Sequence, residues 1–254
     1  MNIAVITGAS SGMGRDFALE IDKKNLDEIW IIARRENRLT ELKEMLNTNA
    51  LILPLDLTKS DSFEEYQRML DEKNPTVKYL VNASGFGKFG DFSEVSEQDS
   101  IDMINLNVKA TVRMTVKTIP FMNRGSRIIQ LCSSSSFLPL PYMNIYASTK
   151  AFISHYTKAL QVELKPKGIT ATAVSPYFVE TEFLALADKT KENGLKQYKP
   201  IYKSKDVVIK AIRDADKGKT QSVLGAFTNL FRFSSRFFSR TLMTKIWLGM
   251  RKEN

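Results

Sequence analysis

Tyr146 and Lys150 stand four positions apart in the segment IYASTK, residues 145–150. On a helix, side chains at this spacing are surface neighbours, so the phenol and the ammonium would reach into one site. Such a pair could transfer a proton, because a nearby cation stabilises a phenolate whose ordinary pKa is about 10. The alternative is a half-buried ring beside a solvated charge, and the other motifs of the chain must decide.

A glycine-rich segment, TGASSGMG, follows a strand-like run at residues 7–14. Gly8, Gly12 and Gly14 would allow a tight turn, a close approach to a pyrophosphate, and a helix whose first amides face the phosphates. The alternative is a purely structural glycine turn. Because the motif both follows a strand and opens a helix, it predicts a dinucleotide-binding turn.

The next strand-like run ends in Ala33-Arg34-Arg35. A fold of this kind that selects NAD carries an acid here for the ribose 2′-hydroxyl. Two guanidinium groups would instead bind a 2′-phosphate, with a hydroxyl contact from Ser10. The arginines could alternatively begin a solvated helix. The pattern favours NADP over NAD.

The third strand-like run is followed by Asp56-Leu57. Asp56 is placed to touch the edge of an adenine, but an aspartate after a strand is equally a turn or capping residue.

Seven short apolar runs alternate with longer amphipathic segments. The runs are residues 2–7, 28–33, 50–55, 78–82, 126–132, 169–175 and 221–225. The helix-length segments are around 13–24, 35–47, 60–73, 97–123, 146–165 and 204–217. This alternation predicts an α/β fold with a doubly wound parallel sheet and helices on both faces. Ligands would bind beyond the carboxyl ends of the strands.

The chain resembles the short-chain dehydrogenase/reductase family in five motifs taken together: TGASSGMG, VNASG at 81–85, Asn107 in NLNVKA, the serine run 133–136 and YASTK. The resemblance covers nearly the whole chain in order and spacing. It implies a Rossmann-like domain with a seven-stranded parallel sheet, and carbonyl/alcohol chemistry on NAD(P).

The resemblance also implies four catalytic residues, Asn107, Ser133, Tyr146 and Lys150. Ser133, thirteen residues before Tyr146, would donate to the substrate oxygen. Tyr146 would supply the proton, and Lys150 with the oxidised nicotinamide would stabilise its phenolate. Lys150 would also hold the nicotinamide ribose, and Asn107 would hold a water beside Lys150.

Cofactor contacts are expected along the same motifs, with Thr181 at the nicotinamide carboxamide. The expected cofactor-binding residues are Gly8, Ser10, Ser11, Gly12, Met13, Gly14, Arg34, Arg35, Asp56, Leu57, Asn82, Ala83, Tyr146, Lys150, Pro176, Val179 and Thr181. The chain departs from the family's pattern in Asn82-Ala83-Ser84-Gly85, and in Ser136 and Tyr177, where glycines are usual. By the resemblance, Ser136 and Tyr177 lie around the substrate and the nicotinamide, so they would change the shape of the pocket.

Composition narrows the function classes. The 254 residues predict one domain, with a catalytic part at 1–225 and a basic amphipathic helical extension at 226–254. Cys132 and His155 are the only cysteine and histidine, which excludes disulfide frameworks, CxxC and His-rich metal sites; no metal site is expected. The start lacks a signal-peptide pattern, and no apolar run reaches roughly 18 residues, so we expect a cytoplasmic protein.

The net charge of +9 is concentrated after Leu224, where six basic residues face one acidic residue. No zinc-finger, RNP or helix-turn-helix signature accompanies it, so no nucleic-acid partner is expected. In residues 229–252, Arg232, Arg236 and Arg240 repeat every four positions and would form one cationic stripe on a helix. The helix would cover the substrate pocket or a neighbouring subunit, or lie peripherally on a membrane.

The leading interpretation is an NADP-dependent oxidoreductase acting on a carbonyl or secondary alcohol, with a lipophilic substrate such as a ketosteroid or 3-oxoacyl compound. An NADP-binding sensor or scaffold is the alternative. Substrate specificity is expected in residues 86–92, 137–144 and 181–202, which are rich in apolar side chains. By resemblance we expect a homodimer or homotetramer paired through residues 97–123 and the helix from 146, although these faces could simply pack on the sheet.

Overall fold

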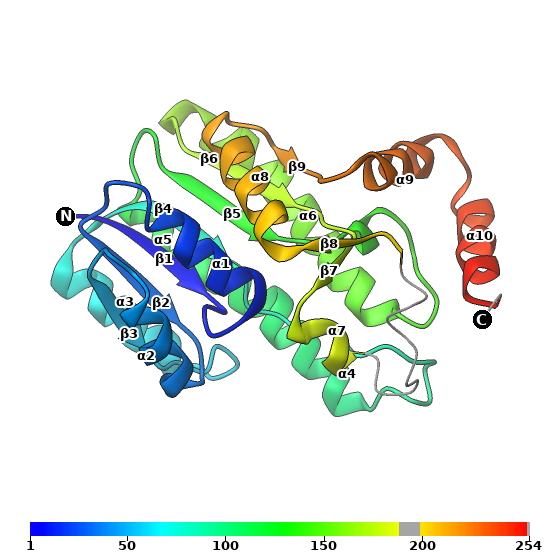
Figure 1. Cartoon of the computed structure of the whole chain (residues 1–254), viewed down its shortest axis with the longest axis horizontal. Coiled ribbons are helices and arrows are strands. Elements are labelled where there is room, and N and C mark those ends of the chain that lie inside the picture. The colour runs from blue at the N-terminus through cyan, green and yellow to red at the C-terminus, as the bar shows by residue number, and fades with distance from the viewer. Residues whose placement is uncertain (188–198, 253–254) are drawn as a thin grey trace.

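The central sheet contains seven parallel strands in a computed structural model that describes residues 1–187 and 199–252. Its strands are β1 (Asn2–Thr7), β2 (Glu28–Ile32), β3 (Ala50–Leu53), β4 (Thr76–Asn82), β5 (Arg127–Leu131), β6 (Thr170–Val174) and β9 (Gln221–Ser222). The order across the sheet is β3-β2-β1-β4-β5-β6-β9, so strands are added on one side of β1 up to β3 and on its other side from β4 onward (Figure 1). Ligand sites of open parallel sheets lie where the strand order reverses in this way. The predicted doubly wound fold is confirmed.

Helices cover both faces of the sheet because successive strand residues point to opposite sides. In β1, Ala4 and Ile6 pack into one buried layer and Ile3 and Val5 into the other. The first layer is completed by α1 (Gly12–Ile21), α2 (Glu36–Glu44) and α8 (Ser204–Asp216). The second is completed by α3 (Asp61–Lys73), α5 (Thr111–Thr118) and α6 (Asn144–Leu164).

The expected single helix over 97–123 is interrupted. It consists of α4 (Glu97–Ile104), a π-helical turn η1 (Asn105–Ala110) and α5, followed by the 3₁₀ turn η2 (Ile119–Phe121). Pro120 lies in η2 and cannot continue the α-helical hydrogen bonds. The widened turn η1 carries Asn107, one of the predicted catalytic residues.

Two short strands absent from the prediction form a separate small parallel sheet. They are β7 (Phe178–Glu180) and β8 (Ile201–Lys203), and α7 (Glu182–Ala187) follows β7. Each strand has three residues, too few to produce a recognisable periodic pattern. The 3₁₀ turns η3 (Ser134–Phe137) and η4 (Lys165–Lys167) complete the elements before the C-terminal region.

The C-terminal extension is helical, as predicted, but it is two helices rather than one. These are α9 (Ala226–Phe237) and α10 (Arg240–Lys252), at the end of the molecule opposite the N-terminus (Figure 1). Phe238 is extended, and the Ser239 hydroxyl accepts a hydrogen bond from the Leu242 amide at 3.2 Å, which caps α10. The predicted single cationic stripe is therefore wrong, since Arg240 begins a new helix. None of the helices in the described ranges combines the length and apolarity needed to cross a bilayer.

Candidate active site

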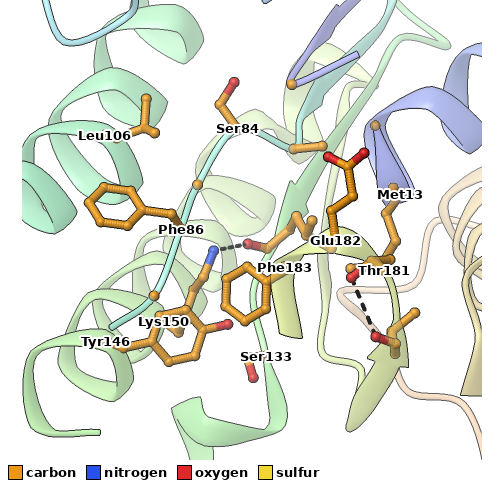
Figure 2. A pocket seen from close by; sticks show the side chains of 18 of the residues that line it. Met13, Ser84, Phe86, Leu106, Ser133, Tyr146, Lys150, Thr181, Glu182 and Phe183 are labelled. Carbon is orange, nitrogen blue, oxygen red and sulfur yellow. Dashed lines mark hydrogen bonds between the residues drawn. The ribbon is translucent and has the colours of Figure 1, made fainter. Parts of the chain in front are cut away.

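A cavity of about 760 Å³ opens at the carboxyl ends of the strands and contains most of the predicted site residues. Those lining it are Gly8, Ser10, Ser11, Gly12, Met13, Gly14, Arg34, Arg35, Asp56, Leu57, Ala83, Ser133, Tyr146, Lys150, Pro176, Val179 and Thr181. Asn82 and Asn107 are not among its lining residues. Figure 2 shows Met13 and Thr181 on one side of the cavity and Tyr146, Lys150 and Phe86 on the other.

The glycine turn is shaped by close backbone contacts. Gly8 has φ +69°, and a Cβ there would lie 2.9 Å from the backbone of Ala83 at the end of β4. A Cβ on Gly14, in the first turn of α1, would overlap the carbonyl oxygen of Gly8. Any side chain at either position would push these segments apart. The turn therefore brings the first amides of α1 to the cavity, the arrangement that suits a pyrophosphate.

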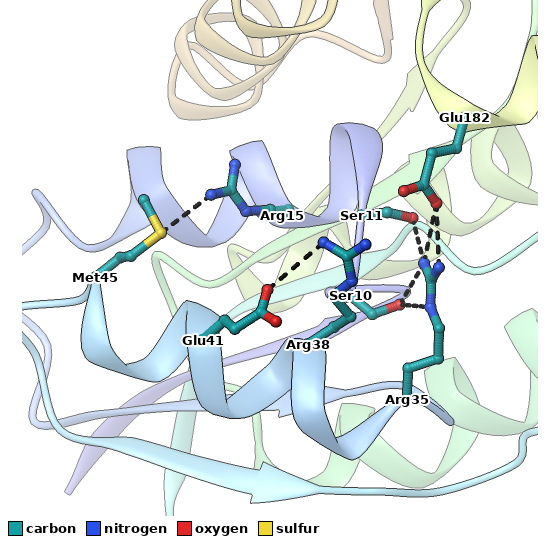
Figure 3. A network of polar contacts seen from close by, with 8 residues as sticks. All are labelled: Ser10, Ser11, Arg15, Arg35, Arg38, Glu41, Met45 and Glu182. Carbon is teal, nitrogen blue, oxygen red and sulfur yellow. Dashed lines mark hydrogen bonds and ion pairs between the residues drawn. The ribbon is translucent and has the colours of Figure 1, made fainter.

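Arg35 lies against this turn at the start of α2. Its guanidinium donates to Ser10 Oγ at 3.2 Å and to Ser11 Oγ at 2.9 Å. It also forms an ion pair with Glu182 Oε2 at 3.2 Å, so that one guanidinium joins the glycine turn to the beginning of α7 (Figure 3). Glu182 was predicted only as part of the specificity segment 181–202 and not as a partner of Arg35. It follows Thr181 directly, but no spacing signal linked it to Arg35.

Asp56 has the turn role considered for it, and its contact with an adenine stays a prediction. It lines the cavity, and its Oδ1 accepts hydrogen bonds from the amide and the hydroxyl of Thr58 at 3.0 and 2.8 Å. Partial burial acts to raise the pKa of Asp56, but these hydrogen bonds and the charge of Arg34 outweigh it and leave the pKa below its ordinary value. Asp56 is thus a negatively charged turn residue at the cavity edge.

Tyr146 and Lys150 lie one helical turn apart on α6, and both are buried. Lys150 Nζ is 5.8 Å from the centre of the Tyr146 ring and donates to the Leu131 carbonyl, at the end of β5, at 2.8 Å. Burial lowers the pKa of Lys150 to about 8. The ammonium is therefore held by a fixed backbone acceptor at the inner end of the cavity.

The pKa of the Tyr146 phenol is not lowered in the protein alone, without a bound nicotinamide. Burial raises the pKa of Tyr146 above its ordinary value, and a hydrogen bond with Ser133 opposes this only in part. The neighbouring Cys132 also acts to raise it. Any further stabilisation of a phenolate must come from what binds in the cavity.

Ser133 is placed by the end of β5 and the turn that follows. Its Oγ accepts a hydrogen bond from the Ser135 amide at 3.1 Å. Ser136 stands where the family usually has glycine, and its hydroxyl donates to the Ser133 carbonyl at 2.6 Å. This departure therefore tightens the turn that holds Ser133. Ser134 and Ser135 also line the cavity but are almost fully buried.

Asn107 positions the loop after β4. Its Nδ2 donates to the Phe86 carbonyl at 2.9 Å and to Thr149 Oγ1 at 3.1 Å, and its Oδ1 accepts from the Phe86 amide at 3.0 Å. The side chain thus ties this loop to α6, and its role in holding a water stays a prediction. Asn82 is turned toward α5, where its Nδ2 donates to Thr115 Oγ1 at 3.1 Å.

Aromatic and aliphatic side chains surround Tyr146. Phe89 and Phe183 lie with ring centres 5.6 and 5.5 Å from that of Tyr146. The apolar side chains lining the cavity also include Phe86, Leu140, Met143, Tyr177, Phe178, Leu184, Phe231 and Trp247. The three predicted specificity segments all contribute, although residues 188–198 of the last lie outside the described part of the chain.

Phe231 and Trp247 come from α9 and α10, so the C-terminal extension forms part of the cavity wall. Trp247 is buried, and its indole N–H donates to the Pro141 carbonyl at 3.3 Å. Tyr177, another departure from the family's glycine, has its ring centre 6.3 Å from that of Phe231. Of the alternatives for this tail, covering the pocket is the one that these contacts favour.

The described residues contain no group of three His, Cys, Asp or Glu side chains that could hold a metal ion. The polar side chains of the cavity include several hydroxyls, two arginines and the buried Lys150, which suit a phosphorylated organic ligand, alongside Lys88 and the acids Asp56, Asp102 and Glu182.

Known proteins resemble this chain. The family model for short chain dehydrogenases matches residues 2–192. An uncharacterized oxidoreductase of Staphylococcus epidermidis is 30% identical over 181 residues, covering 70% of this chain and 78% of the relative. The very-long-chain 3-oxoacyl-CoA reductase of Macaca fascicularis is 29% identical over 197 residues, covering 74% of this chain and 62% of the reductase. A serine dehydrogenase solved in complex with NADP⁺ is 25% identical with a TM-score of 0.78, covering 88% of this chain and 94% of that structure.

Proposed function

Because the chain belongs to the short-chain dehydrogenase family, we propose that it is an NADP(H)-dependent oxidoreductase that interconverts a carbonyl group and a secondary alcohol. The observation that carries this proposal is one cavity with a phosphate-type turn at one end and Ser133, Tyr146 and Lys150 at the other. The apolar lining around Tyr146 supports a lipophilic substrate, of the size and character of a ketosteroid or a 3-oxoacyl compound.

The residues of the cavity fit a dinucleotide phosphate. The contact between Gly8 and the backbone of Ala83 leaves room for no side chain, and the first amides of α1 are presented to the cavity. Arg35, with Arg34 beside it, would bind the 2′-phosphate, while Ser10 and Ser11 already hold the Arg35 guanidinium. The NADP⁺ bound by a 25% identical neighbour supports the same choice.

The proposed mechanism assigns one task to each polar group at the inner end. When bound, the cofactor would supply the hydride. Ser133 donates a hydrogen bond to the substrate oxygen, where negative charge develops. Tyr146 would donate the proton to that oxygen, and the cation of Lys150, together with the oxidised nicotinamide, would stabilise the phenolate that remains. Asn107 positions Phe86 and the loop after β4, so that the apolar wall faces the reacting carbonyl.

An assay of NADPH oxidation tests the proposal on ketosteroids, 3-oxoacyl thioesters, quinones and simple aldehydes. We expect turnover with at least one lipophilic carbonyl class, with more activity on NADPH than on NADH. If NADPH binds tightly and no carbonyl is reduced, the protein is the NADP-binding sensor or scaffold considered as the alternative. The retention of Ser133, Tyr146 and Lys150 in one cavity supports catalysis over binding alone.

We further propose that the protein is a homodimer or homotetramer that works in the cytoplasm. Helix α6 supports pairing, because Phe152 and Val162 expose apolar surface, 49% and 73% of each side chain. The C-terminal extension is proposed to make peripheral membrane contact. Light scattering tests the oligomeric state, and fractionation of cells tests the location.

A further inference from the structure

Helices α9 and α10 expose several large apolar side chains that do not line the cavity. We call this set the outer face; it comprises Leu230, Phe233, Phe237, Phe238, Leu242 and Ile246. Their exposed fractions run from 45% for Leu242 and Ile246 to 68% for Phe237. Monomeric proteins rarely leave so many neighbouring apolar side chains in water, so this surface is suited to a partner.

The outer face is distinct from the residues that hold the two helices to the domain. Phe231, Met243 and Trp247 pack into the buried cluster around Tyr146. Leu230, Phe233 and Phe237 follow one another at helical spacings of three and four, as do Leu242 and Ile246 in α10. Packing of the domain therefore accounts for the inner residues and leaves the outer face without a role in folding.

Basic side chains lie on the same two helices, with Arg236 and Arg240 exposed and Arg232 half-buried. Residues 226–252 contain no aspartate or glutamate, and within the described part of the chain no ion pair involves Arg232, Arg236, Arg240 or Lys245. Burial and the neighbouring Arg236 both lower the pKa of Arg232. Cations that crowd together without a carboxylate favour a partner that brings negative charge.

We propose that the outer face binds an anionic lipid surface, with its phenylalanines and leucines at the boundary of headgroups and acyl chains and its arginines at lipid phosphates. The inference deepens the peripheral membrane contact proposed above but does not require the reductase activity. A second copy of the chain is less suited, because two identical outer faces would bring their arginines together without acidic partners.

Vesicle flotation of the full chain tests this inference. We expect binding to vesicles that mix phosphatidylglycerol with phosphatidylcholine, little binding to phosphatidylcholine alone, and loss of binding as salt is raised. Replacing Phe233→Ser together with Phe237→Ser should abolish flotation. The matched control, Met45→Ser with Ile201→Ser, removes two exposed apolar side chains elsewhere and should float like the unmodified chain.

A second pair of double variants tests the contribution of positive charge. Arg236→Gln with Arg240→Gln should weaken binding by about thirtyfold, whereas Lys165→Gln with Lys167→Gln, which removes the same charge from η4, should not. NADPH binding by each variant shows that it is folded.

Two outcomes would overturn the proposal. The full chain could remain unbound by anionic vesicles at low salt, or light scattering could show an oligomer that the Phe233 and Phe237 variant dissociates, which would make the outer face a contact between copies. If the protein floats with anionic vesicles but reduces no carbonyl, the proposed function is refuted and the proposed lipid binding stands.

Discussion

Both Nη atoms of Arg35 lie 3.2 Å from a single carboxylate oxygen, Oε2 of Glu182, although the two residues are 147 positions apart in the chain. The pair places an acid at the position where a 2′-phosphate would bind. A phosphate and the Glu182 carboxylate would then compete for one guanidinium. Glu182 is followed directly by Phe183, which lines the cavity beside Tyr146. If Arg35 released Glu182 to bind a phosphate, the position of Phe183 in the apolar wall would therefore change.

Glu182→Gln is expected to increase the affinity for NADPH by about two- to fivefold, because an exposed ion pair is worth at most about 1 kcal/mol. The affinity for NADH should change little. Fluorescence titration of both reduced cofactors measures this, with Glu180→Gln as a control that removes a nearby exposed carboxylate. Unchanged NADPH affinity would show that Glu182 does not compete.

Arg35→Met is expected to weaken NADPH binding by about ten- to a hundredfold and to leave NADH binding almost unchanged, since only NADPH presents a phosphate to this guanidinium. The control is Arg38→Met on the same helix, where Arg38 pairs with Glu41 at 3.5 Å. Isothermal titration gives both dissociation constants. If the affinities for NADPH and NADH fell equally, Arg35 would support the fold of the site and would not recognise the phosphate.

Tyr146→Phe should lower kcat by about a hundred- to ten-thousandfold while NADPH affinity is kept, because the substitution removes a proton donor and preserves the ring. Tyr156→Phe, on the same helix, should retain activity. Stopped-flow NADPH oxidation with an active carbonyl substrate from the screen gives the rates. Full activity in the Tyr146 variant would refute the assigned proton transfer.

Lys150 predicts a pH dependence of stability. Burial lowers its pKa to about 8, so between pH 8 and 10 the unfolded chain binds more protons than the folded one. The free energy of unfolding should therefore rise, by about 1 kcal/mol from pH 7.5 to 9, relative to Lys150→Met. Cys132, whose pKa burial raises to about 12, acts in the opposite direction at higher pH and is present in both proteins. Urea unfolding at several pH values measures the difference, and parallel curves for the two proteins would contradict it.

Trp247→Ala is expected to lower the free energy of unfolding by about 3 kcal/mol, because the indole is buried against the segment around Pro141. It should also raise KM for a bulky carbonyl substrate and leave NADPH affinity unchanged. Ile246→Ala, its exposed neighbour, should change stability by less than about 0.5 kcal/mol. Chemical denaturation and steady-state kinetics check the two effects, and an unchanged KM would remove Trp247 from the substrate wall.

The parts of the site that local sequence determines were predictable. The strand, glycine turn and helix at residues 2–21 form a continuous segment whose backbone requirements are visible in residue types. Tyr146 and Lys150 are set by one helical turn. The seven strands of the large sheet were identified because each is a short apolar run between turns.

Contacts between distant segments were not predictable in this way. Glu182 reaches Arg35 only because β7 ends beside the glycine turn, and no periodicity marks a single acid after a three-residue strand. The break between α9 and α10 did leave a signal, since Ser239 precedes a new apolar pattern and caps it. The raised pKa of Tyr146 depends on how completely the surrounding segments bury it, which spacing alone does not give.

The wall formed by Phe231 and Trp247 lies beyond residues 2–192, the part that the family model matches. The groups proposed to perform the chemistry and some of those proposed to shape the space for the substrate therefore lie in separate stretches of the chain. After a duplication, changes confined to the last two helices would give a descendant a new substrate range while its proton donor and cofactor turn stayed under unchanged selection.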